Sequence, residues 1–321
     1  MVSRREAIAR TAMMGVSALA GRTIPVLADS TQSAVGFAVP AGACDCHAHV
    51  FDPAPFPYAP TRLYTPDPAP VEEMRVLHRA LGIARVVIVQ PSVYGTDNAC
   101  TLEAIRQLAP AARGVAVIDD AASDAALGEM EKGGIRGARI NLETAGQTDP
   151  AEGRRRFERM VGRLTKRKWH VQIYTRPTVI QGIADLVRSS PIPVVFDHFG
   201  GAQAVAGLKQ PGFDTLVELV RKGHAYVKIS APYRSSTQAP YSDMAPFAQA
   251  LIGANPQRIL WGSDWPHPDS TARPGRQATD IAPRFPIDDG VVLNQLAVWA
   301  PAADLRKQIL VDNPARLYGF D

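Results

Sequence analysis

Short apolar runs alternate along the chain with longer amphipathic segments. The run Val-Val-Ile-Val at 86–89 is solid rather than alternating, as expected for a strand covered on both faces. Comparable β-branched runs predict strands at 43–50, 85–90, 114–118, 137–142, 170–174, 194–197, 226–230 and 258–261. Segments with helical periodicity follow them at 71–81, 100–108, 122–132, 152–167, 179–189, 213–222, 242–253 and, to close the chain, 290–317. The pattern therefore predicts repeated strand-then-helix units.

Eight such units in one chain match a (β/α)8 barrel better than an open doubly wound sheet. An open sheet normally carries a glycine-rich phosphate-binding turn after its first strand, whereas this chain has His-Ala-His at 47–49. An apolar fraction of 46% is ample for a globular core. We therefore predict an α/β fold, a single-domain TIM barrel over residues 43–321.

The first residues have the composition of an export signal. Arg4 and Arg5 precede a short, mildly apolar stretch that ends in Val26-Leu27-Ala28, where the small residues suit a signal protease. The stretch is too short to span a membrane. We predict a twin-arginine signal peptide over 1–28, an N-terminal extension over 29–42, and a periplasmic mature protein. A basic tail is the alternative.

Removal of residues 1–28 changes the interpretation of the charge. These residues carry Glu6 and four arginines, a net +3 of the formal +4, so the remaining chain carries +1. A nearly neutral chain gives no case for nucleic-acid binding. No later apolar run approaches membrane length, so we expect no stable membrane insertion.

The candidate chemistry lies at the ends of the predicted strands, where barrel enzymes place their active sites. The first strand supplies His47 and His49, which share a face because residues two apart in a strand point the same way. Two imidazoles on one face suit a metal ion or proton transfer, although such a pair also arises by chance or in structural roles. The sixth strand leads into His198, and the eighth into Asp264, the strongest acid candidate.

Polar side chains at other strand ends suit the binding of an anionic ligand. An arginine within a barrel strand is costly to bury without an anion, so we interpret Arg139 as a binding residue. Lys228 is ambiguous, because it either serves the site or instead pairs with Asp197 or with an acid of a neighbouring strand. The remaining candidates for contact with a ligand are Ser92, Tyr174, Arg234 and His267.

Three motifs carry a resemblance to a known group of proteins. They are His47-Ala48-His49, the stretch Asp-His-Phe-Gly at 197–200, and Trp-Gly-Ser-Asp-Trp-Pro-His at 261–267. Together they resemble the amidohydrolase superfamily. The loop at 56–66, with Tyr64, is similar to the branch that holds 2-pyrone-4,6-dicarboxylate lactonases, 4-sulfomuconolactone hydrolases and galactarolactone isomerases. The resemblance covers essentially all of residues 41–321.

The resemblance bears on metal binding, because a metal-dependent member is expected to have a histidine on its fifth strand. Gln172 and Tyr174 occupy that strand here, and the cationic Arg139 disfavours a second cation nearby. The resemblance is also to a branch whose lactone-processing members include enzymes that need no metal. We therefore expect no required metal, with one zinc ion as the alternative. The ligands of that zinc are expected to be His47, His49, His198 and Asp264.

A second departure concerns the substrate. Pyrone-dicarboxylate lactonases are expected to have an arginine three residues after the sixth-strand histidine, where this chain has Gly201. That difference argues against a pyrone dicarboxylate as substrate and leaves Arg139 and Arg234 as the carboxylate-binding arginines.

The sequence thus predicts a hydrolase or isomerase that acts on a small carboxylated lactone. Asp264 is expected to deprotonate water or substrate. The three histidines at 47, 49 and 198 and Arg139 stabilise the oxyanion. The predicted substrate-binding residues are Arg234, Tyr64, Tyr174 and Ser92, with His267 as donor to the leaving oxygen. The alternatives are a mononuclear zinc-dependent amidohydrolase or decarboxylase, and an exported carboxylate-binding protein without turnover.

Overall fold

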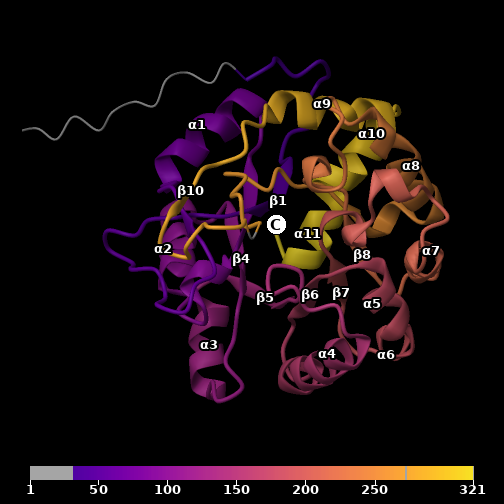
Figure 1. Ribbon diagram of the computed structural model, residues 1–321. Helices are drawn as coiled ribbons and strands as arrows, with labels where there is room; N and C mark the ends of the chain where they lie inside the picture. The colour runs from indigo at the N-terminus through magenta and orange to yellow at the C-terminus, as the bar shows by residue number, and fades with distance from the viewer. Residues whose placement is uncertain (1–31, 272, 321) are drawn as a thin grey trace, which may run out of the picture. The chain divides into compact units, whose positions relative to one another are not determined.

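A ring of parallel strands surrounded by helices forms the core of the protein (Figure 1). The computed structural model describes residues 32–271 and 273–320. In this part of the chain eight parallel strands pair in the order β1 (Cys44–Ala48), β3 (Arg85–Val89), β4 (Ala112–Ala116), β5 (Ile135–Asn141), β6 (His170–Tyr174), β7 (Val194–Phe196), β8 (Tyr226–Lys228) and β9 (Ile259–Leu260). The predicted α/β barrel architecture is confirmed, whereas the predicted signal peptide lies outside the described residues.

Backbone hydrogen bonds join the two end strands of this sheet. The amide of Cys46 donates to the carbonyl of Trp261, and the amide of His49 donates to the carbonyl of Trp265. In return, the amide of Asp264 donates to the carbonyl of His47, with an N···O distance of 2.8 Å. The segment after β9 therefore pairs with β1 and closes the barrel, and this closure involves two predicted site residues.

Helices pack around the outside of the strands (Figure 1). Their bounds are α1 (Val71–Leu81), α2 (Ala99–Leu108), α3 (Asp124–Lys132), α4 (Pro150–Leu164), α5 (Pro177–Gly182), α6 (Ala184–Arg188), α7 (Phe213–Arg221), α8 (Ala245–Ala254), α9 (Asp289–Trp299), α10 (Ala303–Lys307) and α11 (Asn313–Tyr318). The predicted helix at 179–189 is divided into α5 and α6, because the backbone leaves the helical region at Ile183. No helix among the described residues combines the length and apolar character needed to span a bilayer.

Helix α1 shows how the sequence pattern fixes an element. Its buried residues include Val71, Met74 and Leu81, spaced so that one stripe faces the core. The helix ends at Gly82, which adopts the left-handed conformation with φ of 71° and donates its amide to the last turn. The predicted bounds, 71–81, match the observed ones.

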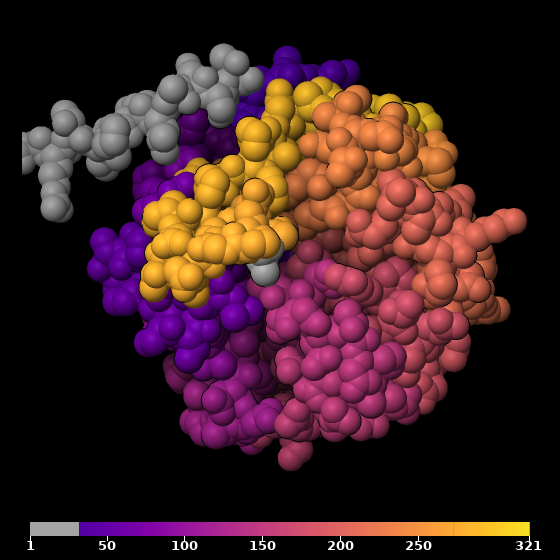
Figure 2. Space-filling view, in the orientation of Figure 1, coloured from indigo at the N-terminus to yellow at the C-terminus, as the bar shows by residue number. Residues whose placement is uncertain are grey.

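Two loops at the mouth of the barrel are joined to each other. Strand β2 (Thr65–Pro66), in the loop after β1, pairs with β10 (Ile281–Ala282), in the loop after β9. The Thr65 hydroxyl also donates to the carbonyl of Ala278 at 2.7 Å. Figure 2 shows the light-orange loop after β9 spread beside the indigo loop after β1. These two loops therefore form one connected wall at the mouth.

Candidate active site

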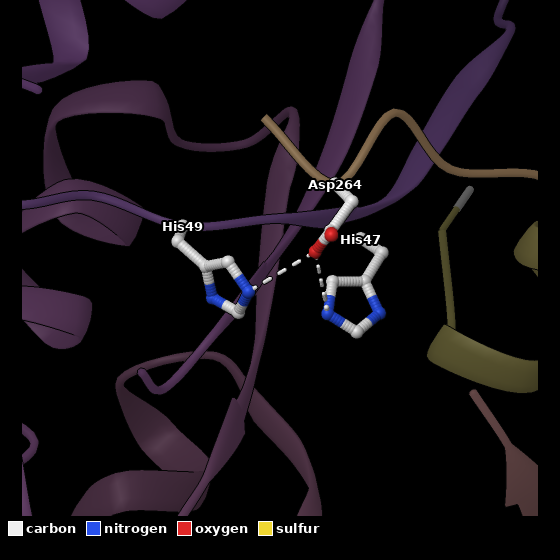
Figure 3. A group of neighbouring side chains, drawn as sticks. All are labelled: His47, His49 and Asp264. Carbon is white, nitrogen blue, oxygen red and sulfur yellow. Dashed lines mark ion pairs between the residues drawn. The ribbon is translucent and has the colours of Figure 1, made fainter. Parts of the chain in front are cut away.

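His47, on β1, and His49, directly after it, point into the barrel. The strand has an irregular register between Asp45 and Ala48, and His47 and His49 lie with their rings directed at Asp264 (Figure 3). The Nδ1 atom of His49 lies 2.7 Å from the carbonyl oxygen of Val89. Because a carbonyl can only accept, this Nδ1 carries a proton, and the Nε2 atom of His49 faces Asp264.

Asp264 occupies a tight turn at the barrel closure. Its φ of 65° is unusual for a residue with a side chain, although aspartate tolerates this region better than most. Gly262 precedes the turn, and a Cβ atom at that position would lie 2.7 Å from the Cβ of His47. The glycine is therefore required for Asp264 and β1 to approach as closely as they do.

One carboxylate oxygen of Asp264 is surrounded by imidazole nitrogens. Its Oδ1 lies 3.3 Å from Nε2 of His49, 3.6 Å from Nε2 of His47 and 3.7 Å from Nε2 of His198. Within the described residues, neither this Oδ1 nor the Nε2 of His47 has a hydrogen-bond partner. The structure thus brings together all four residues that the sequence predicted as catalytic, with unsatisfied buried polar atoms between them.

The other carboxylate oxygen is firmly held. Oδ2 of Asp264 accepts hydrogen bonds of 2.6 Å from Nε of Arg234 and 2.6 Å from the hydroxyl of Tyr233. Burial acts to raise the pKa of Asp264, but the Arg234 guanidinium and the His198 imidazole outweigh it and hold the pKa well below its usual range. Asp264 is therefore ionised at neutral pH.

His198 follows β7 and is held by the next strand of the barrel. Its Nδ1 lies 2.9 Å from the hydroxyl oxygen of Ser230, which follows β8. Burial lowers the pKa of His198 to about 4, although Asp264 and Asp197 oppose the shift. At neutral pH the ring is uncharged, so it acts as a hydrogen-bonding group or ligand rather than as a cation.

A buried polar layer lies beneath the histidines. Asp197 is 3.3 Å from Nζ of Lys228 and 3.3 Å from Nε of Arg139, so Lys228 does pair with Asp197. Gln172 bridges the pair, because its amide nitrogen donates to Asp197 and its oxygen accepts from Lys228 at 2.7 Å. Burial acts to raise the pKa of Asp197, but Lys228 and His47 outweigh it and hold the pKa well below its usual range.

The charges of the site are unequal. Two buried carboxylates, Asp197 and Asp264, face three cations, Lys228, Arg139 and Arg234, which leaves a net charge of +1 when the histidines are neutral. The side chain of Arg139 is only 5% exposed, and within the described residues its guanidinium makes no hydrogen bond. Such an arrangement favours an anionic ligand next to Arg139.

Five of the six predicted binding residues line one small cavity, which Asp264 also lines. Its walls include Tyr64 and Ser92 from loops at the mouth, and Tyr174 from the end of β6, together with Arg139 and Arg234. Larger cavities adjoin it on two sides. One, of about 470 Å³, shares Ser92 and Arg139, and another, of about 530 Å³, shares Tyr174 and Arg234.

His267 lies elsewhere. Its Nε2 lies 3.0 Å from a carboxylate oxygen of Asp289, at the start of α9, and its ring packs edge-on against Tyr233. It is not among the residues that line the small cavity. The structure places His267 behind Tyr233, so contact with a leaving oxygen stays a prediction that this geometry does not support.

The donor atoms around Asp264 Oδ1 suit a single divalent ion. Three imidazole nitrogens and one carboxylate oxygen are zinc ligands, and in a tetrahedral site with bonds of about 2.0–2.1 Å neighbouring ligand atoms lie roughly 3.3 Å apart. The distances of 3.3 to 3.7 Å from Oδ1 to the three nitrogens are close to that spacing. The proton on His49 Nδ1 likewise leaves its Nε2 free to bind a metal. The ligand atoms of His47, His49 and Asp264 lie within 4.8 Å of one another, so these three residues fit such an ion, and Nε2 of His198 lies 3.7 Å from the same Asp264 oxygen.

The sequence profile of one family matches most of the chain. Residues 44–320 match the amidohydrolase family. The chain belongs to that family. The match covers the barrel, with histidines at the end of the first strand and an aspartate after the last.

Three similar amidohydrolases are informative. The chain is 37% identical to 4-sulfomuconolactone hydrolase of Rhizobium radiobacter, over 89% of this chain and 92% of that protein. It is 35% identical to 2-pyrone-4,6-dicarboxylate hydrolase of Comamonas testosteroni, over 88% of this chain and 92% of that protein. A solved structure from Acinetobacter baumannii is described as a probable 2-pyrone-4,6-dicarboxylic acid hydrolase with citric acid bound. Its superposition on this chain has a TM-score of 0.71 and a sequence identity of 25%, and it covers 87% of this chain and 100% of that chain.

Sequence reasoning missed two contributors to the site. Tyr233 hydrogen-bonds Asp264, and Lys228 touches His47, yet neither was predicted as a site residue. Tyr233 directly precedes Arg234, and the prediction of Arg234 as a site residue was a signal that Tyr233 lies nearby. Lys228 lies within a predicted strand, and lysine is rarely buried in such a position, so its presence there was a signal for a role in the site.

Proposed function

We propose that this chain hydrolyses a small lactone that carries a carboxylate group. The observation that carries the proposal is the net positive charge of the buried site, in which Arg139 makes no hydrogen bond among the described residues and lines the same small cavity as the ionised Asp264. A carboxylated lactone would supply the missing negative charge and an electrophilic carbonyl. Its two named relatives act on lactones or pyrones of this kind, which supports the same substrate class here.

In the proposed reaction Asp264 acts as the base. Its free Oδ1 accepts a proton from a water molecule as the water oxygen bonds to the lactone carbonyl carbon. The ring C–O bond then breaks, and the leaving oxygen takes that proton back from Asp264. A carboxyl group with a low pKa is a weak base, so the reaction depends on stabilisation of the oxyanion as well.

The imidazoles provide that stabilisation. The side chains of His47 and His198 are buried and uncharged near neutral pH, because burial lowers the pKa of both. An uncharged ring with a proton on Nε2 donates a hydrogen bond to a developing oxyanion. Arg139, at the edge of the same cavity, adds a fixed positive charge.

Arginine and hydroxyl groups hold the substrate carboxylate. Arg139 makes no hydrogen bond among the described residues, although its Nε faces Asp197, whereas Arg234 already bonds Asp264 and the carbonyl of Pro268. Arg139 is therefore the principal carboxylate anchor, and Arg234 chiefly orients Asp264. Tyr64, Ser92 and Tyr174 surround the ring in the same cavity.

We further propose that no metal is required. With a net charge of +1 already buried, a divalent ion adds repulsion that only further anions could offset. If zinc binds, His47, His49, His198 and Asp264 hold it, and it would acidify a water molecule. Metal analysis of protein purified without chelator tests this, because a stoichiometric ion lost together with activity would establish the zinc-dependent alternative.

A panel of muconolactones, sugar-acid lactones and pyrone carboxylates tests the function directly. Hydrolysis releases one proton per ring opened, which a pH-stat records. Consumption of a lactone without acid release would indicate isomerisation, in which Asp264 deprotonates a substrate hydroxyl. Tight binding without turnover across the panel would instead establish a carboxylate-binding protein.

A further inference from the structure

A buried amine lies directly under the catalytic histidines. Lys228, on β8, is fully buried, and its Nζ lies 2.7 Å from Oε1 of Gln172 and 3.3 Å from Nδ1 of His47. It is also 3.3 Å from Oδ1 of Asp197. Lys228 thus connects β8 with β6 and β1 and with the residue that follows β7, directly beside His47.

We propose that Lys228 is a positioning residue that fixes the proton of His47 on Nε2, the nitrogen that faces Asp264. A lysine ammonium has hydrogens to donate and no lone pair to accept. When it bonds Nδ1 of His47, that nitrogen must be the acceptor. A neutral imidazole carries one N–H, which is then on Nε2.

Asp197 is the competitor for the same nitrogen. Its Oδ1 lies 3.2 Å from Nδ1 of His47, and as an acceptor it would favour the opposite tautomer. This contact, however, lacks the geometry of a hydrogen bond, whereas the contact between Lys228 and Nδ1 has it. Asp197 instead uses Oδ2, which accepts from the Gln172 amide at 3.0 Å. Lys228, rather than Asp197, is therefore the hydrogen-bond partner of Nδ1 of His47.

His47 and His49 then have opposite tautomers. The Val89 carbonyl holds a proton on Nδ1 of His49, while Lys228 holds the proton of His47 on Nε2. His47 Nε2 is 3.6 Å from Asp264 Oδ1, too far for a hydrogen bond, and it has no partner among the described residues. This buried N–H is available for the carbonyl oxygen of a substrate. Only this last step rests on the proposed lactone reaction.

Nitrogen-15 NMR of the full chain labelled with [15N]histidine tests the tautomer directly. Protonated and bare ring nitrogens have well-separated shifts, and loss of one set of signals in a His47→Gln variant assigns the ring. We expect Nε2 of His47 to be protonated in the unsubstituted protein. A proton on Nδ1 there would overturn the proposal without reference to activity.

Substitution of Lys228 extends the test. In Lys228→Met, which has a similar length and no donor, we expect the proton to move to Nδ1 and to bond Asp197. Lys228→Arg, which can only donate, should keep it on Nε2. Retention of the Nε2 proton in Lys228→Met would overturn the proposal. Lys222→Met, at an exposed lysine paired with Glu218, is the matched control and should leave the His47 signals unchanged.

Kinetics separate this proposal from the proposed function. Loss of one oxyanion donor should lower kcat of Lys228→Met by about 10²–10³-fold with a smaller change in KM, and Lys228→Arg should recover part of that loss. If the tautomer changes as expected but kcat does not, His47 is not the carbonyl donor. The proposed reaction would then fail in that step, while the positioning role of Lys228 would stand.

Discussion

Nε of Arg234 donates a 2.6 Å hydrogen bond to Oδ2 of Asp264, and this leaves Oδ1 as the free oxygen of the carboxylate. The arginine therefore has two effects on the proposed base. It aims Oδ1 at the imidazoles, and it holds the pKa of Asp264 well below the usual range against the opposing effect of burial.

Replacement of Arg234 should shift the pH dependence of the reaction. The ionised Asp264 is the active form, so activity is lost as pH falls through its pKa. Arg234→Gln removes the nearby cation, raises that pKa and should move the acidic limb of kcat/KM upward by about one pH unit or more, which corresponds to roughly 1.4 kcal/mol or more. A pH–rate profile measures the shift, with Arg154→Gln at an exposed arginine as control. An unchanged acidic limb would remove Asp264 from the role of base.

Asp264→Asn should abolish most of the turnover and still fold. Loss of a general base lowers kcat by about 10²–10⁴-fold. Asparagine tolerates the φ of 65° at this position, so the turn itself is retained. Circular dichroism should show the native signal with a lower Tm, because Arg234 loses its buried partner. Asp185→Asn, at an exposed aspartate, provides the comparison, and near-normal lactone turnover in Asp264→Asn would contradict the mechanism.

Arg139→Met should weaken substrate binding more than it slows the chemical step. A charged hydrogen bond contributes about 1.5–3 kcal/mol, so we expect KM for a carboxylated lactone to rise roughly 10- to 150-fold. Steady-state kinetics with a matched lactone that lacks the carboxylate serves as control, because its KM should not change. Equal losses for both lactones would show that Arg139 does not bind the carboxylate.

We propose that residues 1–28 direct export by the twin-arginine route to the periplasm. Residues 1–30 fused to a reporter should carry it out of the cytoplasm in a folded state, and Arg4→Lys with Arg5→Lys should block that transport. Cell fractionation measures the distribution. A reporter that remains in the cytoplasm with both arginines present would disprove the signal.

Much of the site was predictable because its residues lie in local motifs. The spacing of His47 and His49 predicts a shared face, and the turn that holds Asp264 is evident from its glycine and proline neighbours. Solid apolar strands and one-sided helices likewise predicted the barrel, with α1 placed to the residue.

The contacts that tune the site could not be predicted in the same way. The pairing of Lys228 with Asp197 and Gln172 depends on the register of three neighbouring strands, which a single sequence does not specify. The surroundings of His267 could not be predicted for a similar reason. His267 follows the Asp264 turn closely in sequence, but Asp289 of α9 draws its ring away from the cavity.

The closure of the barrel has a consequence for how a ligand reaches the site. Asp264 and His47 belong to the two backbone segments whose pairing completes the barrel, so opening between these segments would separate the two residues. The loops after β1 and β9 are joined to each other through β2 and β10. We therefore expect a ligand to reach the small cavity from its flanks, past Ser92 on one side or Tyr174 on the other, where larger cavities adjoin it.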